Sequence, residues 1–557
     1  MSKPSLFALC CALLMSTTTQ AAARPRLGVL VVFDQLPVWL LERYAPFFPD
    51  GFGGFDDGAR FDAFYAYAGT ETAPGHATLS TCTLPSVHGI ATNSWFVEGK
   101  KLYAVDDPTF PTLMAAGAKA KGGRSPRYLM ANTLGDAMKT ESGGRARVVT
   151  LSHKDRSAIL TAGHAADLAV WYDNDQGRFT TSTAYADVLP PWLEEAGAAL
   201  PAATMKSGTW TPLPIPKGLE WLVPVDDKPG EGALKGYDRT FPHDIKDVEP
   251  AAQHLGYRLT PHSISDLFTL ALRAVDAEKL GADDEPDFLV VSVSTTDVVG
   301  HNYGGESLEQ LDTLRRADLE LRRFLKGLEA KIGRNNFVVG VSSDHGAPQL
   351  PQTIISSGLE VKTVTYEDVV DAANKAGESI GGSMALASGK GTPTLVTGKK
   401  RVRGFFPPQL FLDEDDLDAA GKQRLRDAIE KAVEALPGVS QVYQMVSPAG
   451  VQGPDEDGYG VFMRGSYNPQ RSAPIFVRTD PRVVLMETRG QATGTDHGTA
   501  YVYDRRVPFL LRGAGVRRGR YSTPVDVRDI APTLAFLMGV SPPDSCQGRP
   551  VPAVGER

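Results

Sequence analysis

The stretch Phe288-Leu289-Val290-Val291-Ser292-Val293-Ser294 is a short run of mostly apolar and β-branched residues. A run of this length and composition is typical of a strand that is buried on both faces of a sheet. Residues 307–329 follow, with leucines and phenylalanines at helical spacing, and residues 337–342 then repeat the apolar run. Strand, helix and strand in this order predict a mostly parallel sheet with helices on both faces.

Two further runs of the same kind extend the predicted sheet. Residues 26–33 lead directly into Asp34, and residues 148–152 lead into the polar sequence His153-Lys154-Asp155-Arg156. Functional sites in such sheets form at the carboxyl ends of the strands. The sequence therefore predicts an α/β fold, a doubly wound sheet between layers of helices, with its site among the polar residues that follow each run.

The 557 residues are enough for a large core and for additional units. Residues 1–23 combine Lys3, an apolar run and a stretch of small residues, which predicts a cleaved signal peptide. We expect the catalytic core to occupy residues 24–350. Residues 351–484 mix short strand-like and helix-like segments, which indicates a smaller α+β insertion, and residues 485–557 resume the pattern of the core.

The mature chain has the composition of an ordinary soluble globular enzyme, and the predicted signal peptide indicates that it is exported. No later apolar stretch is long enough to span a membrane, so we expect a periplasmic or secreted protein that acts as a monomer. Removal of the signal peptide leaves 57 basic and 66 acidic side chains, a net charge of −9 that disfavours nucleic-acid binding. Only Cys82 and Cys546 remain, and the sequence leaves open whether they pair or stay as buried thiols.

The segment Thr70-Glu71-Thr72-Ala73-Pro74-Gly75-His76 contains a candidate nucleophile, Thr72. A threonine before Ala-Pro-Gly and a helix-compatible run is typical of a helix N-cap, with the proline in the first turn. Such a cap is an ordinary structural feature by itself. The free amides and the dipole of a helix start also bind anionic phosphate, so Thr72 is both a predicted cap and a candidate catalytic residue.

Carboxylates and imidazoles occur at four places near the predicted strand ends: Asp34, Asp297 with His301, Asp344 with His345, and His497. Asp297 and His301 are four residues apart, so they share a face if their segment is helical. Each histidine alone is more typical of a hydrogen-bonded structural residue. Three aspartates and three histidines together indicate a metal centre, because carboxylate oxygen and imidazole nitrogen are zinc ligands.

In their order and spacing these motifs resemble the alkaline phosphatase superfamily. The resemblance includes Thr72 within Thr-Ala-Pro-Gly-His, the sequence His88-Gly89-Ile90 with Asn93, and the aspartates and histidines above, and it covers residues 27–549. Lys154 and Arg156, combined with a threonine nucleophile, are similar to the PafA-type branch of secreted bacterial phosphate monoesterases. Cys82 departs from this pattern, since glycine is common at its place in the nucleophile helix.

The resemblance implies two zinc ions per chain, with two sets of ligands: Asp297, His301 and His497 for one ion, and Asp34, Asp344, His345 and the Thr72 oxygen for the other. Two zinc ions about 4 Å apart can stabilise the attacking and leaving oxygens of an in-line displacement. Thr72 would attack phosphorus and form a phosphothreonine. In the family pattern Asn93, Lys154 and Arg156 donate to the remaining phosphoryl oxygens. Because Lys154 and Arg156 are two residues apart, we expect them on one side of an extended strand end.

These observations predict a zinc-dependent alkaline phosphatase that hydrolyses small phosphate monoesters and releases inorganic phosphate. The alternative on the same scaffold is a phosphodiesterase or nucleotide pyrophosphatase, whose second ester substituent would have to occupy the space beside Lys154 and Arg156. A sulfatase is disfavoured, because Thr72 is not the cysteine or serine that such enzymes modify. A non-catalytic zinc-binding or phosphate-binding protein has no support, since no expected ligand is missing.

Overall fold

The computed structural model describes residues 24–554, apart from ten short segments: 116–118, 233–236, 250–251, 379, 381–383, 386–393, 396–398, 448–449, 453–457 and 487–492. The predicted signal peptide, residues 1–23, lies outside the described residues. In the part of the chain that is described, none of the helices has the length and apolar character needed to cross a membrane.

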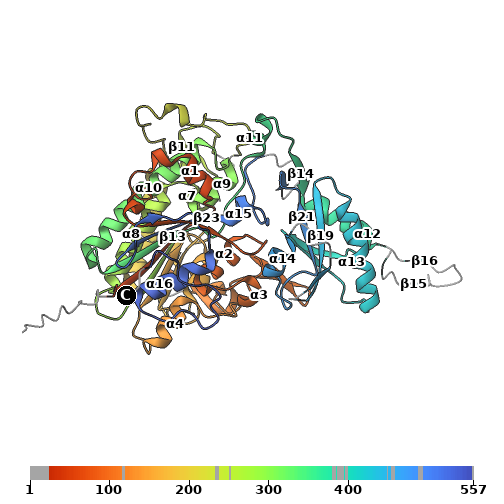
Figure 1. The fold of residues 1–557 in the computed structure, drawn as a ribbon, viewed down its shortest axis with the longest axis horizontal. Coiled ribbons are helices and arrows are strands. Elements are labelled where there is room, and N and C mark those ends of the chain that lie inside the picture. Colours follow the sequence, from red (N-terminus) through yellow and green to blue (C-terminus); the bar gives the residue numbers. More distant parts are fainter. Residues whose placement is uncertain are drawn as a thin grey trace, which may run out of the picture.

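A ten-stranded, mostly parallel sheet forms the centre of the molecule (Figure 1). Its main path runs through nine strands in the order β24 (Gly519–Arg520), β2 (Ala59–Phe64), β23 (Arg506–Gly513), β13 (Phe337–Ser342), β1 (Leu27–Phe33), β12 (Asp287–Val293), β7 (Val148–Ser152), β8 (Leu168–Asp173) and β9 (Arg178–Thr180). The tenth strand, β25 (Val525–Asp526), pairs with β2. The four predicted strands are all present and run parallel, so the predicted fold class is confirmed.

In the predicted unit of strand, helix and strand, a third strand lies between the two strands that the helix connects. Helix α10 (Leu308–Ile332) connects β12 to β13, but β1 lies between these two strands, so that Val31 aligns with Val291 on one side and with Val341 on the other. The helix begins after Ser307, whose hydroxyl accepts a hydrogen bond from the Gln310 amide. This strand order brings the carboxyl ends of β1, β12 and β13 together at one edge of the sheet.

Helices cover both faces of the sheet, which explains the uninterrupted apolar runs. Alternate residues of β1 point to opposite faces. Val31 and Phe33 belong to the core under α8 (His262–Ala277) and α10, whereas Leu30 and Val32 belong to the core under α4 (Leu134–Glu141) and α16 (Ile530–Met538). Figure 1 shows the two helical layers on opposite sides of the strands.

A second, smaller unit lies to one side of the main sheet (Figure 1). Its elements are the strands β17 (Val402–Phe406), β18 (Gln409–Leu412), β21 (Ile475–Thr479), β19 (Val439–Ser447) and β20 (Gly450–Gln452), the helices α12 (Tyr366–Gly377) and α13 (Ala419–Glu434), and the pair β14 (Lys362–Thr365) and β22 (Val483–Met486). These elements share an apolar cluster of their own, with Leu425, Ile429 and Val442. The boundaries at residues 351 and 484 stay a prediction.

The two cysteines form a disulfide, which settles the question that the sequence left open. Cys82 ends helix α2 (Thr72–Thr81) with a left-handed backbone, φ 49°. Glycine is favoured at such a helix end, because it has no Cβ to clash. Cys82 therefore adopts a backbone conformation that favours glycine, and Cys546 ties this helix end to the C-terminal segment.

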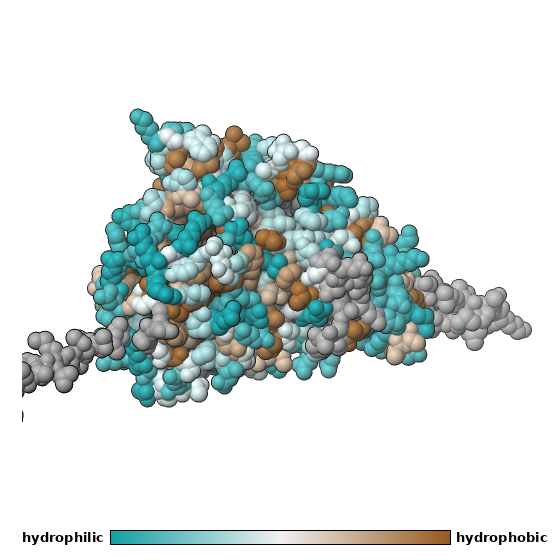
Figure 2. Space-filling model, in the orientation of Figure 1, coloured by the Kyte–Doolittle hydropathy of each residue, from teal (hydrophilic) through white to brown (hydrophobic). Residues whose placement is uncertain are grey.

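The surface in Figure 2 is hydrophilic over most of the face shown, with hydrophobic residues interspersed among polar ones. Isolated apolar residues on a surface are normal for a globular protein and need no binding partner.

Candidate active site

Thr72 is the first residue of helix α2, and Glu71 occupies the N-cap position without a side-chain cap. The prediction that Thr72 caps the helix is therefore wrong by one residue. The reason is that Asn93 caps the helix from outside, since its Oδ1 accepts a hydrogen bond from the Ala73 amide over 2.9 Å. The Glu71 carboxylate in turn accepts a 2.7 Å hydrogen bond from the backbone amide of Asn93. The Thr72 hydroxyl is thereby left available for chemistry.

Lys154 and Arg156 both reach this hydroxyl. Strand β7 ends at Ser152, Lys154 is the N-cap of helix α5 (Asp155–Ala162), and Arg156 lies in the first helical turn. The expected extended strand end is therefore wrong, because the chain is already helical at Asp155. The helix start still directs both side chains inward, with Lys154 Nζ 3.2 Å and Arg156 Nη2 3.4 Å from Thr72 Oγ1.

A partly buried polar chain holds Arg156 in place. Its Nη1 donates to the Tyr103 hydroxyl over 3.2 Å, and Tyr103 donates to Asp155 Oδ1 over 2.6 Å. Arg124 Nε completes the chain with a 2.7 Å bond to Asp155 Oδ2. Sequence reasoning missed Tyr103 and Arg124, because neither belongs to a recognisable pattern and their contacts with Arg156 and Asp155 form only in the folded chain.

The first group of candidate metal ligands consists of Asp297, His301 and His497. Asp297 and His301 lie on helix α9 (Thr295–Tyr303), with His301 Nε2 3.1 Å from Asp297 Oδ1, so the expected common face is present. His497 Nε2 lies 3.9 Å from the same oxygen. The ligand atoms of the three residues, named the outer triad here, lie within 4.8 Å of one another.

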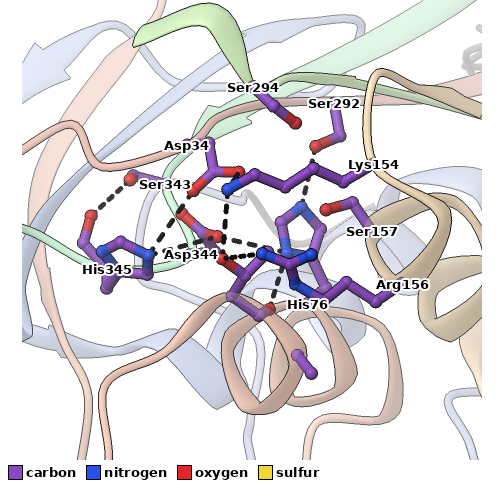
Figure 3. A network of polar contacts seen from close by, with 12 residues as sticks. Asp34, His76, Lys154, Arg156, Ser157, Ser292, Ser294, Ser343, Asp344 and His345 are labelled. Atoms are coloured by element: carbon purple, nitrogen blue, oxygen red, sulfur yellow. Dashed lines mark hydrogen bonds and ion pairs between the residues drawn. The ribbon is translucent and has the colours of Figure 1, made fainter. Parts of the chain in front are cut away.

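The second group, named the inner triad, consists of Asp34, Asp344 and His345 at the carboxyl ends of β1 and β13. His345 Nε2 lies 3.4 Å from Asp34 Oδ1 and 3.6 Å from Asp344 Oδ2, and all three side chains are buried. Their ligand atoms again lie within 4.8 Å of one another. Figure 3 shows this group, with Lys154 extending toward Asp34.

The three histidines share one hydrogen-bonding pattern, in which Nδ1 contacts a backbone carbonyl and Nε2 is directed at the candidate metal ligands. Each directs Nδ1 at a backbone carbonyl: His301 at Thr495 over 2.8 Å, His497 at Thr70 over 2.7 Å, and His345 at Gly346 over 3.0 Å. A carbonyl can only accept, so each Nδ1 carries the proton. Nε2 then faces the carboxylates, the arrangement that backbone carbonyls impose on metal-binding histidines.

Several atoms of the inner triad lack the hydrogen bonds that buried polar atoms normally make. Both Asp34 oxygens, Asp344 Oδ2 and His345 Nε2 make no regular hydrogen bond to a described residue and have only ion-pair contacts with Lys154, His76 and one another. The Lys154 ammonium compensates part of the charge, since Nζ lies 2.6 Å from Asp34 Oδ2 and 2.6 Å from Asp297 Oδ2. Converging atoms of this kind, all of them zinc-ligand types, fit a bound cation.

The carboxylates favour positive charge on two of the three histidines, His345 and His301, whereas burial and these two neighbours lower the pKa of His497. Burial alone would lower the pKa of His345, but Asp344 and Asp34 raise it to about 10. In the outer triad burial likewise opposes protonation, and Asp297 raises the pKa of His301 to about 9. A site that attracts a proton this strongly attracts a metal cation for the same reason.

Gln35 joins the two triads and was missed from the sequence. Its backbone amide donates to Asp344 Oδ1 over 3.1 Å, and its Nε2 donates to Asp297 Oδ1 over 3.2 Å. The residue has a left-handed backbone, φ 59°, and a Cβ added at Gly300 would lie 2.0 Å from Gln35 Oε1. Its position directly after Asp34 was the one available signal.

His76 is a second residue without a predicted role. Its Nδ1 lies 2.8 Å from the Thr72 carbonyl and 3.2 Å from Asp344 Oδ2, while Nε2 lies 2.8 Å from the Ser292 hydroxyl. It thus links helix α2 to the inner triad and to strand β12. Its spacing of four residues from Thr72 in the quoted motif could have indicated this role.

Comparisons with known proteins extend over nearly the whole chain. The model of the type I phosphodiesterase / nucleotide pyrophosphatase family matches residues 29–500. Alkaline phosphatase PafA of Elizabethkingia meningoseptica is 29% identical over 556 residues, covering 96% of this chain and 95% of the relative. Alkaline phosphatase PhoV of Synechococcus elongatus is 30% identical over 548 residues, covering 96% and 94%. A crystal structure of PafA has a TM-score of 0.84 at 28% identity and covers 96% of this chain and 100% of that one.

Proposed function

Because this chain belongs to the type I phosphodiesterase / nucleotide pyrophosphatase family, we propose that it is a phosphate monoester hydrolase with Thr72 as its nucleophile. The relatives named alkaline phosphatase, similar along nearly their whole length, support the monoester class. The observation that carries the proposal is the position of Lys154, whose Nζ lies 3.2 Å from Thr72 Oγ1 and 2.6 Å from one carboxylate of each triad. Nucleophile, phosphate donor and both candidate metal sites therefore meet at one point.

The two triads would hold two zinc ions. Aspartate and histidine ligands in groups of three suit zinc, and the converging inner-triad atoms that lack regular hydrogen bonds fit such an ion. Asp297, His301 and His497 would bind one ion, and the inner triad with Thr72 Oγ1 would bind the other. When bound, the ions supply the positive charge that lowers the pKa of the Thr72 hydroxyl and stabilises the attacking and leaving oxygens.

Thr72 Oγ1 attacks phosphorus as the bond to the alcohol oxygen breaks, and the product is a phosphothreonine. The Thr72 proton leaves to solvent, and the departing alkoxide takes a proton from water. Arg156 and Lys154 donate to the non-bridging oxygens, Arg156 with its planar fork and Lys154 as a point charge. Asn93 Nδ2 is a third donor, because Oδ1 of the same amide is engaged by helix α2. Attack by water on phosphorus then releases inorganic phosphate and restores Thr72.

The same donors favour a monoester over a diester. A monoester presents three non-bridging oxygens to these donors, whereas the second substituent of a diester would have to share the space beside Lys154 and Arg156. The family description supports the diesterase as the second candidate. Comparing kcat/KM for p-nitrophenyl phosphate and bis-p-nitrophenyl phosphate separates the two. We expect the monoester to be preferred, and a preference for the diester in the unmodified enzyme would assign the alternative.

We also propose that the enzyme is exported, to the periplasm or the medium, and acts as a monomer. The disulfide between Cys82 and Cys546 is typical of an oxidising compartment. Every side chain assigned to the site comes from one chain, so the chemistry needs no second copy.

Two treatments test the assignment of the site. Thr72→Ala should lower hydrolysis of p-nitrophenyl phosphate by at least about a thousandfold, as loss of a covalent nucleophile does. Thr81→Ala, at the other end of the same helix, is the matched control and should keep the activity. A chelator should abolish hydrolysis and added zinc should restore it. Full activity in Thr72→Ala or in the chelated protein would disprove the assignment.

A further inference from the structure

A pocket of about 770 Å³ lies beside the site, on the far side of Lys154 and Arg156. Its other walls come from β5 (Asp106–Leu113), the hairpin of β8 and β9, and helix α7 (Gln253–Leu259). Lys154 and Arg156 belong both to this wall and to the site of Thr72, so the pocket opens beside the place where the phosphoryl group would bind, and the alcohol part of a monoester can extend into it.

Four basic side chains line this pocket, and three of them have partners. Arg124 pairs with Asp106 and Asp155, Lys154 with the two triads, and Arg156 with the hydroxyls of Tyr103 and Thr72. The fourth is Arg258, in the last turn of α7. It makes no hydrogen bond or ion pair with any described residue, and its buried Nε has no partner.

An unpaired guanidinium in a partly buried position is costly unless something binds it. Burial lowers the pKa of Arg258 and Arg156 lowers it further, while Asp297 and Asp155 act in the opposite direction. The group nevertheless stays charged, because arginine is not deprotonated in proteins at ordinary pH. Arg258 lines the same pocket as Lys154 and Arg156, so an anionic group on a substrate that extends into this pocket comes within its reach.

The acidic residues of the pocket do not neutralise Arg258. Asp106 and Asp155 are paired with Arg124. Asp173 accepts hydrogen bonds from the Asp175 and Gln176 amides within its own turn, and Asp175 is exposed at the hairpin tip. The inner wall of the pocket therefore offers one unused positive charge to a ligand.

We propose that Arg258 binds a second anionic group on the substrate, so that the enzyme prefers phosphate monoesters whose alcohol carries a carboxylate or another phosphate. This inference rests on the proposed phosphatase function and deepens it. A guanidinium recognises either anion by paired, charge-assisted hydrogen bonds. Arg258 is then a specificity-determining residue, since it would contact the leaving group and not the phosphorus atom under attack.

Three substrates with a three-carbon chain test the proposal on the zinc-loaded enzyme: glycerol 3-phosphate, 3-phosphoglycerate and propane-1,3-diol bisphosphate. Arg258→Gln should lower kcat/KM by about tenfold for each of the two substrates that carry a second anionic group, 3-phosphoglycerate and the bisphosphate. The loss should come mainly through KM, as loss of a hydrogen bond to a charged group does. The value for glycerol 3-phosphate should change less than twofold. Comparing the two substrates with a second anionic group shows whether Arg258 recognises a carboxylate, a phosphate or both.

Two further variants control for charge and for folding. Arg273→Gln removes the same charge from an exposed position on α8 and should alter none of the three substrates. Arg258→Lys keeps the charge and should retain more of the preference for anionic substrates than Arg258→Gln, at an unchanged melting temperature. A similar loss in both Arg258 variants would contradict recognition by charge.

The outcomes separate this proposal from the function on which it rests. An equal loss on all three substrates, or no loss on any, would overturn the role of Arg258 while leaving the phosphatase assignment intact. Failure of the unmodified enzyme to hydrolyse p-nitrophenyl phosphate would overturn the function itself. As a readout independent of turnover, calorimetric titration of Thr72→Ala with 3-phosphoglycerate should show binding about tenfold weaker once Arg258→Gln is added.

Discussion

The inner and outer triads use the same ligand types in different surroundings. The inner triad sits at the ends of two neighbouring strands, and the side chains of Asp34 and His345 are 0% exposed. The outer triad joins a helix to a loop, and the His301 side chain is 36% exposed. The difference supports a proposed division of labour, in which the sheet would hold one metal site beside Thr72 and the more exposed triad would face solvent and the leaving group.

The largest expected effect comes from the inner triad. Asp34→Asn should lower kcat/KM for p-nitrophenyl phosphate by about a thousandfold or more, because it removes a negative charge from the candidate ligands of a fully buried site. Metal analysis should find about one equivalent of zinc lost per chain. An Asp34→Asn enzyme with full activity and two zinc ions would show that the inner triad is not a metal site. Asn335→Asp, on the surface turn before β13, is a control that leaves both triads intact.

Chelation should distinguish the triads by their exposure. Limited EDTA treatment should remove zinc in two phases, the outer ion first, because solvent reaches His301 and not His345. Activity should fall more than tenfold within the first phase. Metal content and activity followed together in time provide the measurement, and a single phase that removes both ions together would contradict the comparison.

Gln35 is the contact through which the triads are expected to depend on each other. Gly300→Ala would place a Cβ 2.0 Å from Gln35 Oε1 and so displace the side chain that donates to Asp297. We expect kcat/KM to fall by about tenfold, the cost of one hydrogen bond to a charged group. Gly54→Ala is the matched control, since nothing lies within 4 Å of its added Cβ. Equal activities in the two variants would exclude the coupling.

The smallest effect concerns the metal-free protein and pH. The pKa values of His345 and His301, about 10 and about 9, lie above the ordinary value of 6.5. Their contribution to stability is therefore fully present below about pH 6.5 and is lost as pH rises toward 9 and 10. The melting temperature of the metal-free protein should fall by a few degrees between pH 7 and pH 10. The melting temperature of the zinc-loaded protein should fall less over the same pH range. A larger fall in the zinc-loaded protein than in the metal-free protein would contradict the proposed electrostatics.

Much of the fold could be predicted because the main strands are buried on both faces. The runs that became β1, β7, β12 and β13 are apolar along their length, and each ends at polar residues of the site. Asp297 and His301 could be placed on one face because helical spacing is regular. By contrast, the exact helix start at Thr72 was missed, because the cap comes from Asn93, a residue that local sequence does not connect to that helix.

The supporting residues could not be predicted, since their roles depend on long-range packing. Tyr103 and Arg124 contact Arg156 or its neighbour Asp155 only after distant segments come together. Arg258 stands out because its buried Nε has no hydrogen-bond partner among the described residues, and no sequence pattern reveals such an absence. The position of Lys154 between both triads likewise follows from strand order and not from its spacing to Arg156.

The most direct test of the account is to trap the covalent intermediate. The zinc-loaded enzyme is mixed with p-nitrophenyl phosphate, quenched in acid within milliseconds, digested and sequenced by mass spectrometry. We expect phosphate on Thr72, with none on Thr70 or Thr78 of the same segment and none in Thr72→Ala. Steady turnover without phosphate on Thr72 at any quench time, or phosphate on another residue, would contradict the central claim that Thr72 is the nucleophile.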